Sequence, residues 1–384
     1  MKIVHICLCG PVTDGFNYQD NLISKYHVKL GHDVTLLASE WIWNKKGKLT
    51  LTNHKDYVND DGVHMIRLPI KLGIINNRLK IYKGLYHTLE QESPDILFVH
   101  GVQFLDVFQV AKYAQKHPNV TVYVDNHADF SNSATTWLSK NILHKILWRI
   151  CAHSILPYAA KFYGVLPARV DFLINLYHIP KEKCELLVMG ADDDLVVKTS
   201  DKEKQLKFRQ KYGIEADDFL IVTGGKIDVW KTQTLLLMKA IRNIKRNDVK
   251  LIIFGSVADS IKRQFDDLLS SDNIQYIGWV NSEQSYLAFA SANLVIFPGR
   301  HSVYWEQAAG EGIPLIVKDW PGTHHVDLGG NVRFLMNDSV EEIQGNIEFL
   351  LDHPDVYDSM KKIAQDKGMS YFSYKEIAKR SIEQ

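Results

Sequence analysis

The sequence has 384 residues, roughly two to three times the usual domain length, so we expect two domains with substantial cores. Its 45 Lys and Arg residues balance 45 Asp and Glu residues, which excludes a global electrostatic attraction to nucleic acid or to anionic membranes. A hydrophobic content of 46% excludes a disordered chain, and four scattered cysteines without a CxxC pair favour a reducing cytoplasm over a disulfide framework.

The amino-terminal residues lack the long apolar core and the cleavage site of a signal peptide. No segment contains the roughly 20 consecutive apolar residues that are needed to cross a bilayer. We therefore expect a cytoplasmic protein that is soluble or peripheral to a membrane.

The first half of the chain alternates between apolar strands and amphipathic helices. Residues 2–10 form an apolar run typical of a buried strand, and Leu22, Ile23, Tyr26 and Leu30 then recur at helical spacing. Further strands are expected at 33–39, 62–70, 95–102, 120–130 and 186–190, and helices near 107–116, 139–163 and 168–178. Strands that are apolar throughout predict a parallel sheet that is covered by helices on both faces.

The second half repeats this alternation after a charged segment at 190–210, which is typical of a linker and the start of a surface helix. Strands are expected at 219–225, 249–256, 274–280, 293–299 and 314–319, and helices at 232–244, 282–290 and from about 303. We predict an α/β chain with doubly wound domains at 1–195 and 196–365, followed by a terminal helix at 366–384. Ligands of such sheets bind beyond the carboxyl ends of the strands, so we expect a cleft between the two domains.

Two strand ends in the first half carry residues that suit a ligand. Gly10 and Gly15 in the first loop would let a ligand approach the backbone closely, although a plain tight turn is the alternative. His127 lies between Asp125 and Asp129, where it could hydrogen-bond sugar hydroxyls or exchange protons near neutral pH. The alternative is a capping aspartate beside a histidine at the edge of the core.

In the second half, the strand ending at Gly225 is followed by Lys226 and Lys231, with a helix after them. Two cations beside exposed backbone amides at a helix start are suited to a diphosphate, whose negative charge grows as it departs as a leaving group. A solvated pair of lysines is the alternative.

The strand at 293–299 also leads into polar residues. Ser302 is a plausible helix N-cap, which would leave the amides of the next residues, including Val303, facing an anion. Glu306, one turn into that helix, could accept hydrogen bonds from a vicinal diol such as a ribose. The alternative is a glutamate that merely stabilises the helix dipole.

The order of these segments resembles the family 4 glycosyltransferases, retaining enzymes of GT-B fold that make bacterial surface polysaccharides. MKIVHI with GHDVTLLAS is similar to the first βαβ unit of that family, and DILFVHG and VDNHADF are similar to its acceptor-domain strands. VTGGKIDVWKTQTLLLMKAI is similar to its phosphate-binding stretch, with Lys226 in place of an arginine and Lys231 at the expected spacing. CELLVMGADDD resembles its interdomain junction, and YFSYKEIAKR its last helix, which often packs back on the first domain.

The resemblance implies a GT-B fold, a nucleoside diphosphate sugar as donor, no cofactor and no metal. Catalytic roles are implied for His127, Lys231 and Glu306: His127 would contact a donor-sugar hydroxyl, Lys231 the diphosphate and Glu306 the ribose. The implied donor-binding residues are Gly10, Gly15, Gly225, Lys226, Lys231, Arg300, His301, Ser302, Val303, Glu306 and Gln307. The residues that we expect at a glycan or lipid-linked acceptor are Asp14, Asn17 and Asp129.

One motif of the family is incomplete. The family places two glutamates eight positions apart before a Gly-x-Pro, which is present here at residues 312–314. Counting back puts Gln307 at the second glutamate, with Glu306 one position earlier, and neither Pro298 nor Gly299 can replace the first. The sugar is therefore open, and Arg300, His301 or Ser302 could take the place of the missing glutamate.

Residues 71–89 and 139–163 mix Lys and Arg with large apolar side chains. They could rest on the inner leaflet beside a lipid-linked sugar, or simply pack on their own sheet. Three other functions remain open: a nucleotide-sugar 2-epimerase, a noncatalytic GT-B subunit that binds a glycan or a partner transferase, and a sugar-binding module without nucleotide affinity.

Overall fold

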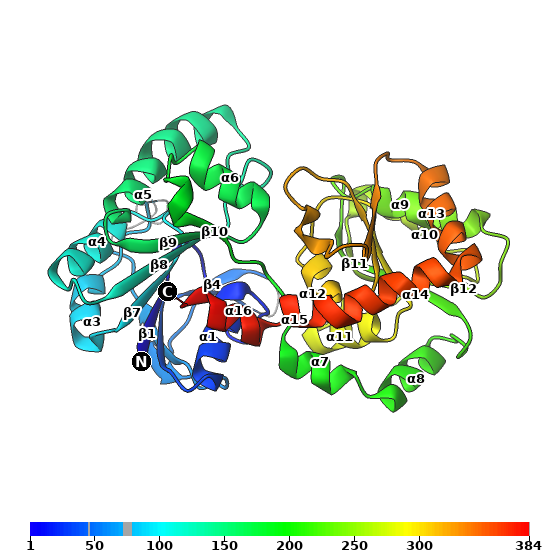
Figure 1. The fold of residues 1–384 in the computed structure, drawn as a ribbon, viewed down its shortest axis with the longest axis horizontal. Coiled ribbons are helices and arrows are strands. Elements are labelled where there is room, and N and C mark those ends of the chain that lie inside the picture. Colours follow the sequence, from blue (N-terminus) through cyan, green and yellow to red (C-terminus); the bar gives the residue numbers. More distant parts are fainter. Residues whose placement is uncertain (45–46, 72–78, 384) are drawn as a thin grey trace. The chain divides into compact units, whose positions relative to one another are not determined.

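The computed structural model describes residues 1–44, 47–71 and 79–383 (Figure 1). The chain forms two compact units: unit 1 contains Met1–Val188 and Ile377–Gln384, and unit 2 contains Met189–Glu376. The expected domain boundary after residue 195 falls instead inside helix α7 (Asp193–Thr199) of unit 2. The reason is a long-range contact, because the backbone N–H of Ala191 donates to the carbonyl oxygen of Phe372 in the same unit. The expected terminal segment from 366 likewise belongs to unit 2 up to Glu376.

Unit 1 is built on an eight-stranded sheet with the order β10-β9-β8-β7-β1-β2-β6-β5. All neighbouring strands are parallel except β5 and β6. The strands are β1 (Lys2–Cys7), β2 (Asp33–Ser39), β5 (Asp56–Val58), β6 (His64–Leu68), β7 (Ile96–His100), β8 (Thr121–Asn126), β9 (Ala159–Gly164) and β10 (Cys184–Leu186). A short antiparallel hairpin joins β3 (Trp41–Trp43) to β4 (Leu49–Leu51).

Helices accompany this sheet because each crossover between parallel strands must return along a covered face. They are α1 (Gln19–Lys29), α3 (Leu85–Glu92), α4 (Val107–Lys116), the π-helix η1 (Ser139–Trp148), α5 (Arg149–Ile155), α6 (Pro167–Asn175) and the short η2 (Lys181–Lys183). The central strands are buried on both faces, as their uninterrupted apolar sequences predict.

The expected helix at 139–163 is wrong at its carboxyl end, since residues 159–164 form strand β9. Pairing with β8 and the burial of Phe162 and Tyr163 override the apparent helical pattern there. The strand expected at 120–130 ends at Asn126, and residues 127–130 form the following loop.

Unit 2 contains a six-stranded, fully parallel sheet with the order β13-β12-β11-β14-β15-β16. Its strands are β11 (Phe219–Ile227), β12 (Val249–Val257), β13 (Ile274–Tyr276), β14 (Leu294–Phe297), β15 (Leu315–Lys318) and β16 (Val332–Leu335). Numbered within the unit, this order is 3-2-1-4-5-6, the arrangement of doubly wound nucleotide-binding sheets. The prediction of two doubly wound, Rossmann-like units is therefore confirmed for the fold.

The helices of unit 2 surround its sheet in Figure 1. They are α7, α8 (Lys202–Lys211), α9 (Gln233–Asn243), α10 (Asp259–Leu268), α11 (Ser282–Ala290), α12 (Tyr304–Gly310), the short η3 (His324–Val326), α13 (Val340–Asp352), α14 (Pro354–Ile363), the π-turn η4 (Ala364–Gly368) and α15 (Met369–Tyr371). The last helix, α16 (Tyr374–Ser381), begins in unit 2, and its residues from Ile377 onward belong to unit 1. Among the described residues, no helix combines the length and hydropathy that a membrane span requires.

Candidate functional site

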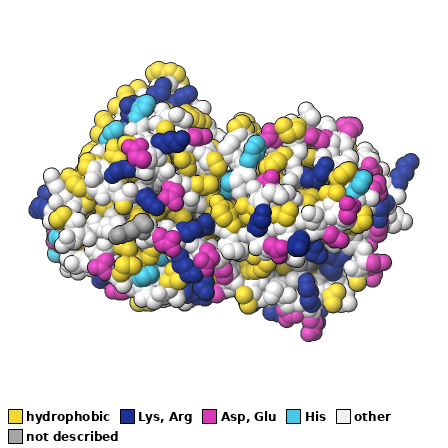
Figure 2. Space-filling view, in the orientation of Figure 1, with side chains coloured by type: hydrophobic (Ala, Val, Ile, Leu, Met, Phe, Trp, Pro, Cys, Tyr) yellow, Lys and Arg dark blue, Asp and Glu magenta, His cyan; other side chains and the backbone are white. Residues whose placement is uncertain are grey.

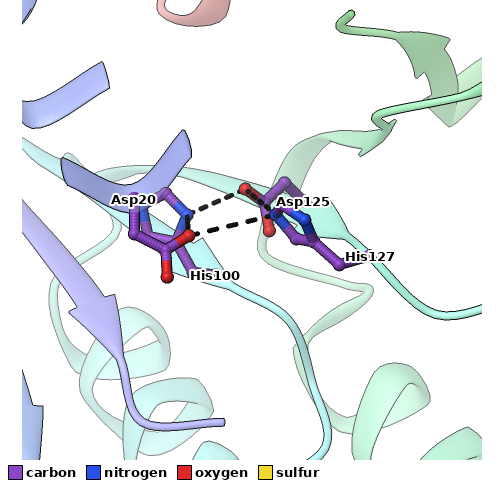
Figure 3. A group of neighbouring side chains, drawn as sticks. All are labelled: Asp20, His100, Asp125 and His127. Atoms are coloured by element: carbon purple, nitrogen blue, oxygen red, sulfur yellow. Dashed lines mark hydrogen bonds and ion pairs between the residues drawn. The ribbon is translucent and has the colours of Figure 1, made fainter. Parts of the chain in front are cut away.

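Four side chains converge at the carboxyl edge of the unit 1 sheet (Figure 3): Asp20, His100, Asp125 and His127. Asp20 stands in the first turn of α1, His100 ends β7, and the other two come from the end of β8 and the loop after it. β1 and β7 are neighbours at the point where the chain reverses its direction across the sheet, which is where doubly wound sheets bind ligands.

His100 is the centre of this cluster. Its Nδ1 lies 2.8 Å from Asp125 Oδ2 and 3.2 Å from Asp20 Oδ1. His127 Nε2 lies 3.2 Å from the same Asp125 oxygen and 4.0 Å from Asp20 Oδ1. The side chains of His100 and Asp125 are 2% and 0% exposed, whereas those of His127 and Asp20 are 37% and 28% exposed, so the cluster opens to solvent on one side.

A chain of hydrogen bonds leads from His100 through the core of unit 1. His100 Nε2 lies 2.9 Å from His5 Nδ1, and His5 Nε2 lies 2.9 Å from His27 Nδ1. His27 Nε2 lies 3.0 Å from the carbonyl oxygen of Ala378. A carbonyl oxygen only accepts hydrogen bonds, so His27 Nε2 carries a proton and donates it to Ala378. If His27 and His5 are neutral, each has one N–H, so His27 Nδ1 accepts from His5 Nε2 and His5 Nδ1 is left as an acceptor. His100 Nε2 must then donate to His5.

The pKa values of His5, His100 and Asp125 are shifted in the directions that these contacts favour. Burial, together with neighbouring histidines, lowers the pKa of His5 well below its ordinary value. Burial disfavours the charged form of His100, but the electrostatic effects of Cys7, Asp125 and Asp20 outweigh it and raise its pKa. Burial likewise opposes ionisation of Asp125, yet His100 and His127 hold the pKa of its carboxyl below the usual range.

Acid sensitivity is expected from the neutral form of His27. Burial lowers the pKa of His27 from 6.5 to about 3, so the unfolded chain binds more protons than the folded chain between these values. The free energy of unfolding should therefore fall as the pH drops through this window, by up to about 1.4 kcal/mol per pH unit. Equilibrium denaturation of His27→Leu should show a shallower fall. The same substitution at the exposed His54 should keep the wild-type slope, and a wild-type slope in His27→Leu would contradict the neutral form.

The other unit 1 residues expected at a site lie in separate contacts. Asp14 is exposed and accepts hydrogen bonds from Arg67 and Tyr57. Gly15 has a φ of 75°, a conformation that favours glycine, whereas Gly10 lies in the exposed loop without such a requirement.

Asp129 is buried and bound to its own loop. It accepts hydrogen bonds from Ser131, and its Oδ2 lies 3.1 Å from Arg169 Nε. Asn17 is half-buried in the first loop. Asp14 and Asp129 contact different partners, and acceptor binding by Asp14, Asn17 and Asp129 stays a prediction.

In unit 2, two lysines lie at and just after the end of β11, beside backbone positions that favour glycine. Gly225 has a φ of 108°, and a Cβ at the neighbouring Gly255 would lie 1.9 Å from the Gly225 carbonyl oxygen, so only glycine fits there. Lys226 is 74% exposed and pairs with Asp228 at 3.2 Å. Lys231 is half-buried, and burial lowers its pKa, with Asp228 opposing and Lys226 reinforcing that shift. The two ammonium groups therefore feel each other's charge.

The loop after β14 adds a third cation. The guanidinium of Arg300 lies 4.7 Å from the ring centre of Trp230 and 6.0 Å from that of Trp320. Trp230 is 63% exposed. β11 and β14 are neighbours at the reversal point of this sheet, so its topology brings the loops that carry Lys226 and Arg300 to one edge.

The structure places Glu306 differently from the expectation. Its side chain is completely buried, and its Oε1 accepts hydrogen bonds from His301 Nε2 and His325 Nε2, both at 2.8 Å. Burial opposes its ionisation, but the two histidines outweigh burial and lower the pKa of the carboxyl. Because the second oxygen is also buried, Glu306 does not present itself to a ribose in this arrangement.

The helix start near Ser302 also differs from the expectation. The N-cap of α12 is Val303 rather than Ser302, and no side-chain hydrogen bond caps the helix. Anion binding by the amides of the first turn of α12 (Tyr304–Gly310) stays a prediction. Gln307, at the position of the family's second glutamate, is buried and donates to Glu311 Oε1 at 3.0 Å.

Several members of these two clusters carry little or no signal in the sequence. Asp20 and His100 were not singled out, although His100 ends a predicted strand in the same way as the residues before His127. The position of His100 at the end of a strand was the feature of the sequence that could have identified it. His325, in the short helix η3, carries no sequence signal, because only the folded chain brings it to Glu306.

Comparison with known proteins identifies the character of unit 2. Residues 204–367 match the family model described as glycosyl transferases group 1. This segment is a glycosyltransferase group 1 domain. It contains the two lysines, Arg300 and the Glu306 cluster.

A curated relative supports this assignment over part of the chain. An uncharacterized glycosyltransferase of Methanocaldococcus jannaschii is 22% identical over 154 residues, which are 38% of this chain and 39% of the relative. The match thus spans well under half of the relative's length.

Solved structures match the chain almost end to end. A glycosyltransferase from Rickettsia africae has a TM-score of 0.70 at 15% identity, covering 99% of this chain and 96% of the other. Anabaena HepE in complex with UDP has a TM-score of 0.70 at 14% identity, with coverage of 99% and 98%. A UDP-GlcNAc 2-epimerase from Neisseria meningitidis has a TM-score of 0.63 at 15% identity, with the same coverage. At these identities the likeness shows the fold.

Proposed function

We propose that this chain is a retaining glycosyltransferase of family 4 that moves a sugar from a nucleoside diphosphate sugar to a glycan or lipid-linked acceptor. The observation that carries the proposal is the pair Lys226 and Lys231 beside Gly225, within the segment that matches the group 1 family. A diphosphate placed there would meet two ammonium groups and the backbone of a glycine that leaves no side chain in the way. HepE, a protein of similar fold, binds UDP and UDP-glucose.

The lysines would also act in the reaction. As the glycosidic bond of the donor breaks, charge accumulates on the departing diphosphate, and a half-buried ammonium such as Lys231 stabilises that charge more than a solvated one. No metal is required for this step in the proposal. His127 would contact a hydroxyl of the donor sugar, and the sugar's configuration would be retained.

Direct assay tests the proposal. We expect incubation with UDP, GDP, ADP and dTDP sugars and with CMP sugars, followed by a thermal-shift measurement, to identify one donor class that raises the melting temperature by mass action. Supplying that donor with glycan or lipid-linked acceptors should then release the nucleotide and yield a glycosylated product. Absence of any shift and of any nucleotide release would overturn the proposal.

A noncatalytic subunit of the same fold is the second candidate. It is favoured by one observation: Gln307 stands at the second glutamate position, and the neighbouring Glu306 is buried against two histidines. Such a subunit would release no nucleotide from any donor, and Lys231→Ala would leave its partner binding intact. A 2-epimerase would instead convert the donor sugar without an acceptor.

We also propose that unit 1 rests on an anionic membrane through the segment around η1. Six apolar side chains of this segment are between 38% and 72% exposed: Trp137, Leu138, Ile142, Leu143, Ile146 and Ile150. Lys140 and Lys145 are exposed among them. Figure 2 shows hydrophobic side chains together with Lys and Arg along this edge of unit 1. The other stretch expected to contact a membrane, 71–89, lies partly outside the described residues, since 72–78 are not described.

Vesicle flotation tests this surface. Because apolar burial and basic charge act together, the protein should float with vesicles that contain phosphatidylglycerol and less with neutral vesicles. The double variant Ile146→Ser and Ile150→Ser should stay in the soluble fraction. Val58→Ser removes an apolar side chain that is 66% exposed on β5, and this variant should float as the wild type does. Equal flotation of the double variant would contradict the assignment.

A further inference from the structure

We propose that Asp20, His100, Asp125 and His127 bind one divalent transition-metal ion, with Zn²⁺ as the best-suited ion. This inference departs from the sequence-based expectation that the chain binds no metal. Each residue offers one ligand atom, and the four atoms lie within 4.8 Å of one another. Three separate segments supply them, so folding of unit 1 alone creates the group (Figure 3).

The spacing of the four atoms suits a small tetrahedral site. Zinc binds histidine nitrogen and carboxylate oxygen at about 2.0–2.2 Å, which places neighbouring ligand atoms of a tetrahedron about 3.3–3.6 Å apart. The distances from His100 Nδ1 to Asp125 and Asp20 are 2.8 and 3.2 Å, and those from His127 Nε2 to the same two oxygens are 3.2 and 4.0 Å. Three of these nitrogen–oxygen distances are shorter than the ligand–ligand distance of a zinc tetrahedron and one is longer. Small shifts of the side chains would therefore make room for an ion between the four atoms.

The histidine chain fixes the ring of His100 with Nδ1 toward the carboxylates, where a bound ion would replace the Nδ1 proton. Since the Ala378 carbonyl fixes the direction of the chain, His100 Nε2 donates to His5 Nδ1, and Nδ1 is the atom that faces the carboxylates. Metal-bound histidines in proteins commonly donate their second N–H to a polar partner, which fixes the ring and its tautomer. His5 is that partner here, and it is itself fixed by His27.

The charges of the group also match a divalent cation. Two carboxylates and two neutral imidazoles carry a charge that one divalent ion would cancel. Asp125 Oδ1 is buried and has no hydrogen-bond partner among the residues that the structure describes, so one oxygen of this carboxylate is left without a partner. Two nitrogen and two oxygen ligands favour zinc over the all-oxygen sites of Mg²⁺ and Ca²⁺. The exposed sides of Asp20 and His127 give the ion a route from solvent.

A second His and carboxylate group in the chain does not share these properties. In unit 2, His301 and His325 both direct Nε2 at the single oxygen Oε1 of Glu306, at 2.8 Å each. This group supplies only three ligand atoms, one fewer than the group in unit 1. This group therefore provides a matched control within the same chain.

The ion would change what His127 offers to a substrate. Without metal, His127 Nε2–H donates to Asp125, so Nδ1 is an acceptor; with Nε2 on the metal, Nδ1 carries the proton and becomes a donor. This consequence rests on the proposed transferase function, whereas metal binding itself does not. Loss of metal binding and loss of nucleotide binding are therefore separate results.

Metal titration of the full-length chain provides the test. Protein stripped with a chelator and then titrated with Zn²⁺ should bind one ion by calorimetry and by elemental analysis after desalting. Co²⁺ should give the visible absorption of a tetrahedral site. Asp20→Asn and His127→Gln, which change partly exposed side chains, should fold normally by circular dichroism and weaken Zn²⁺ binding at least tenfold.

Two further variants separate this site from general metal affinity. His5→Phe removes the partner of His100 without removing a ligand and should weaken binding about 10- to 100-fold. His301→Gln, in the control group of unit 2, should bind Zn²⁺ as the wild type does. The proposal would be overturned if wild-type protein bound no Zn²⁺, or if Asp20→Asn and His127→Gln bound it as tightly as wild type.

Discussion

Replacing Lys231 with alanine is expected to weaken binding of the nucleoside diphosphate donor roughly 10- to 100-fold. A charge-assisted hydrogen bond contributes about 1.5–3 kcal/mol, and the half-buried position of this ammonium limits screening by water. Isothermal calorimetry with the donor that gives the largest thermal shift measures the change. The turnover number should fall as well, because the same ammonium stabilises the departing diphosphate.

Two other lysine substitutions calibrate this result. Lys226→Ala should have a smaller effect on donor binding, since Lys226 is 74% exposed and already pairs with Asp228. Lys207→Ala removes a lysine of the same unit that is 69% exposed and paired with Glu203, and it should leave donor affinity unchanged. If Lys231→Ala bound the donor as tightly as Lys207→Ala, the phosphate site would lie elsewhere.

Replacing Glu306 with alanine is expected to lower the free energy of unfolding by about 3–5 kcal/mol. The carboxylate is completely buried and receives two hydrogen bonds, so its removal leaves His301 and His325 without their acceptor. Chemical denaturation measures this change. A glutamate reserved for a ribose would behave in the opposite way, because removing an uncompensated buried carboxylate stabilises the unliganded protein.

Acid titration sharpens the same prediction. The pKa of Glu306 is lower in the folded chain than its ordinary value of 4.5, so its stabilising effect is present above that value and is lost as the pH falls below it. Glu306→Gln should therefore lose less stability than the wild type on acidification. Glu203→Ala changes an exposed glutamate of α8 and should cost less than about 1 kcal/mol at neutral pH. Equal stabilities of Glu306→Ala and Glu203→Ala would contradict the buried role.

The doubly wound architecture could be predicted because uninterrupted apolar strands and periodic helices are local properties of the sequence. Strand β9 could not, since Ala159 and Ala160 continue a helical pattern and only pairing with β8 makes them extended. The unit boundary was misplaced for a similar reason. The charged residues after Met189 look like a linker, yet they pack within unit 2 through contacts with a segment far along the chain.

Some residues of the candidate sites could be predicted from local sequence, and others come together only through tertiary pairing. Lys226, Lys231 and His127 follow predicted strands directly, so strand-end reasoning located them. Asp20 and His100 could be joined only with the order of strands in hand, because β1 and β7 become neighbours through tertiary pairing. The burial of Glu306 could not be predicted because its partner His325 lies beyond a further strand, and sequence spacing does not reveal which carboxylates become buried.

The central claim is that Lys226 and Lys231 hold the diphosphate of a nucleotide sugar. Crystals of the protein with its preferred nucleoside diphosphate test it most directly. We predict phosphate oxygens within about 3 Å of Lys231 Nζ and near the backbone of Gly225, with Lys226 turned from Asp228 toward the phosphates. Phosphates bound at any other surface of unit 2, with Lys226 still paired to Asp228, would contradict the account.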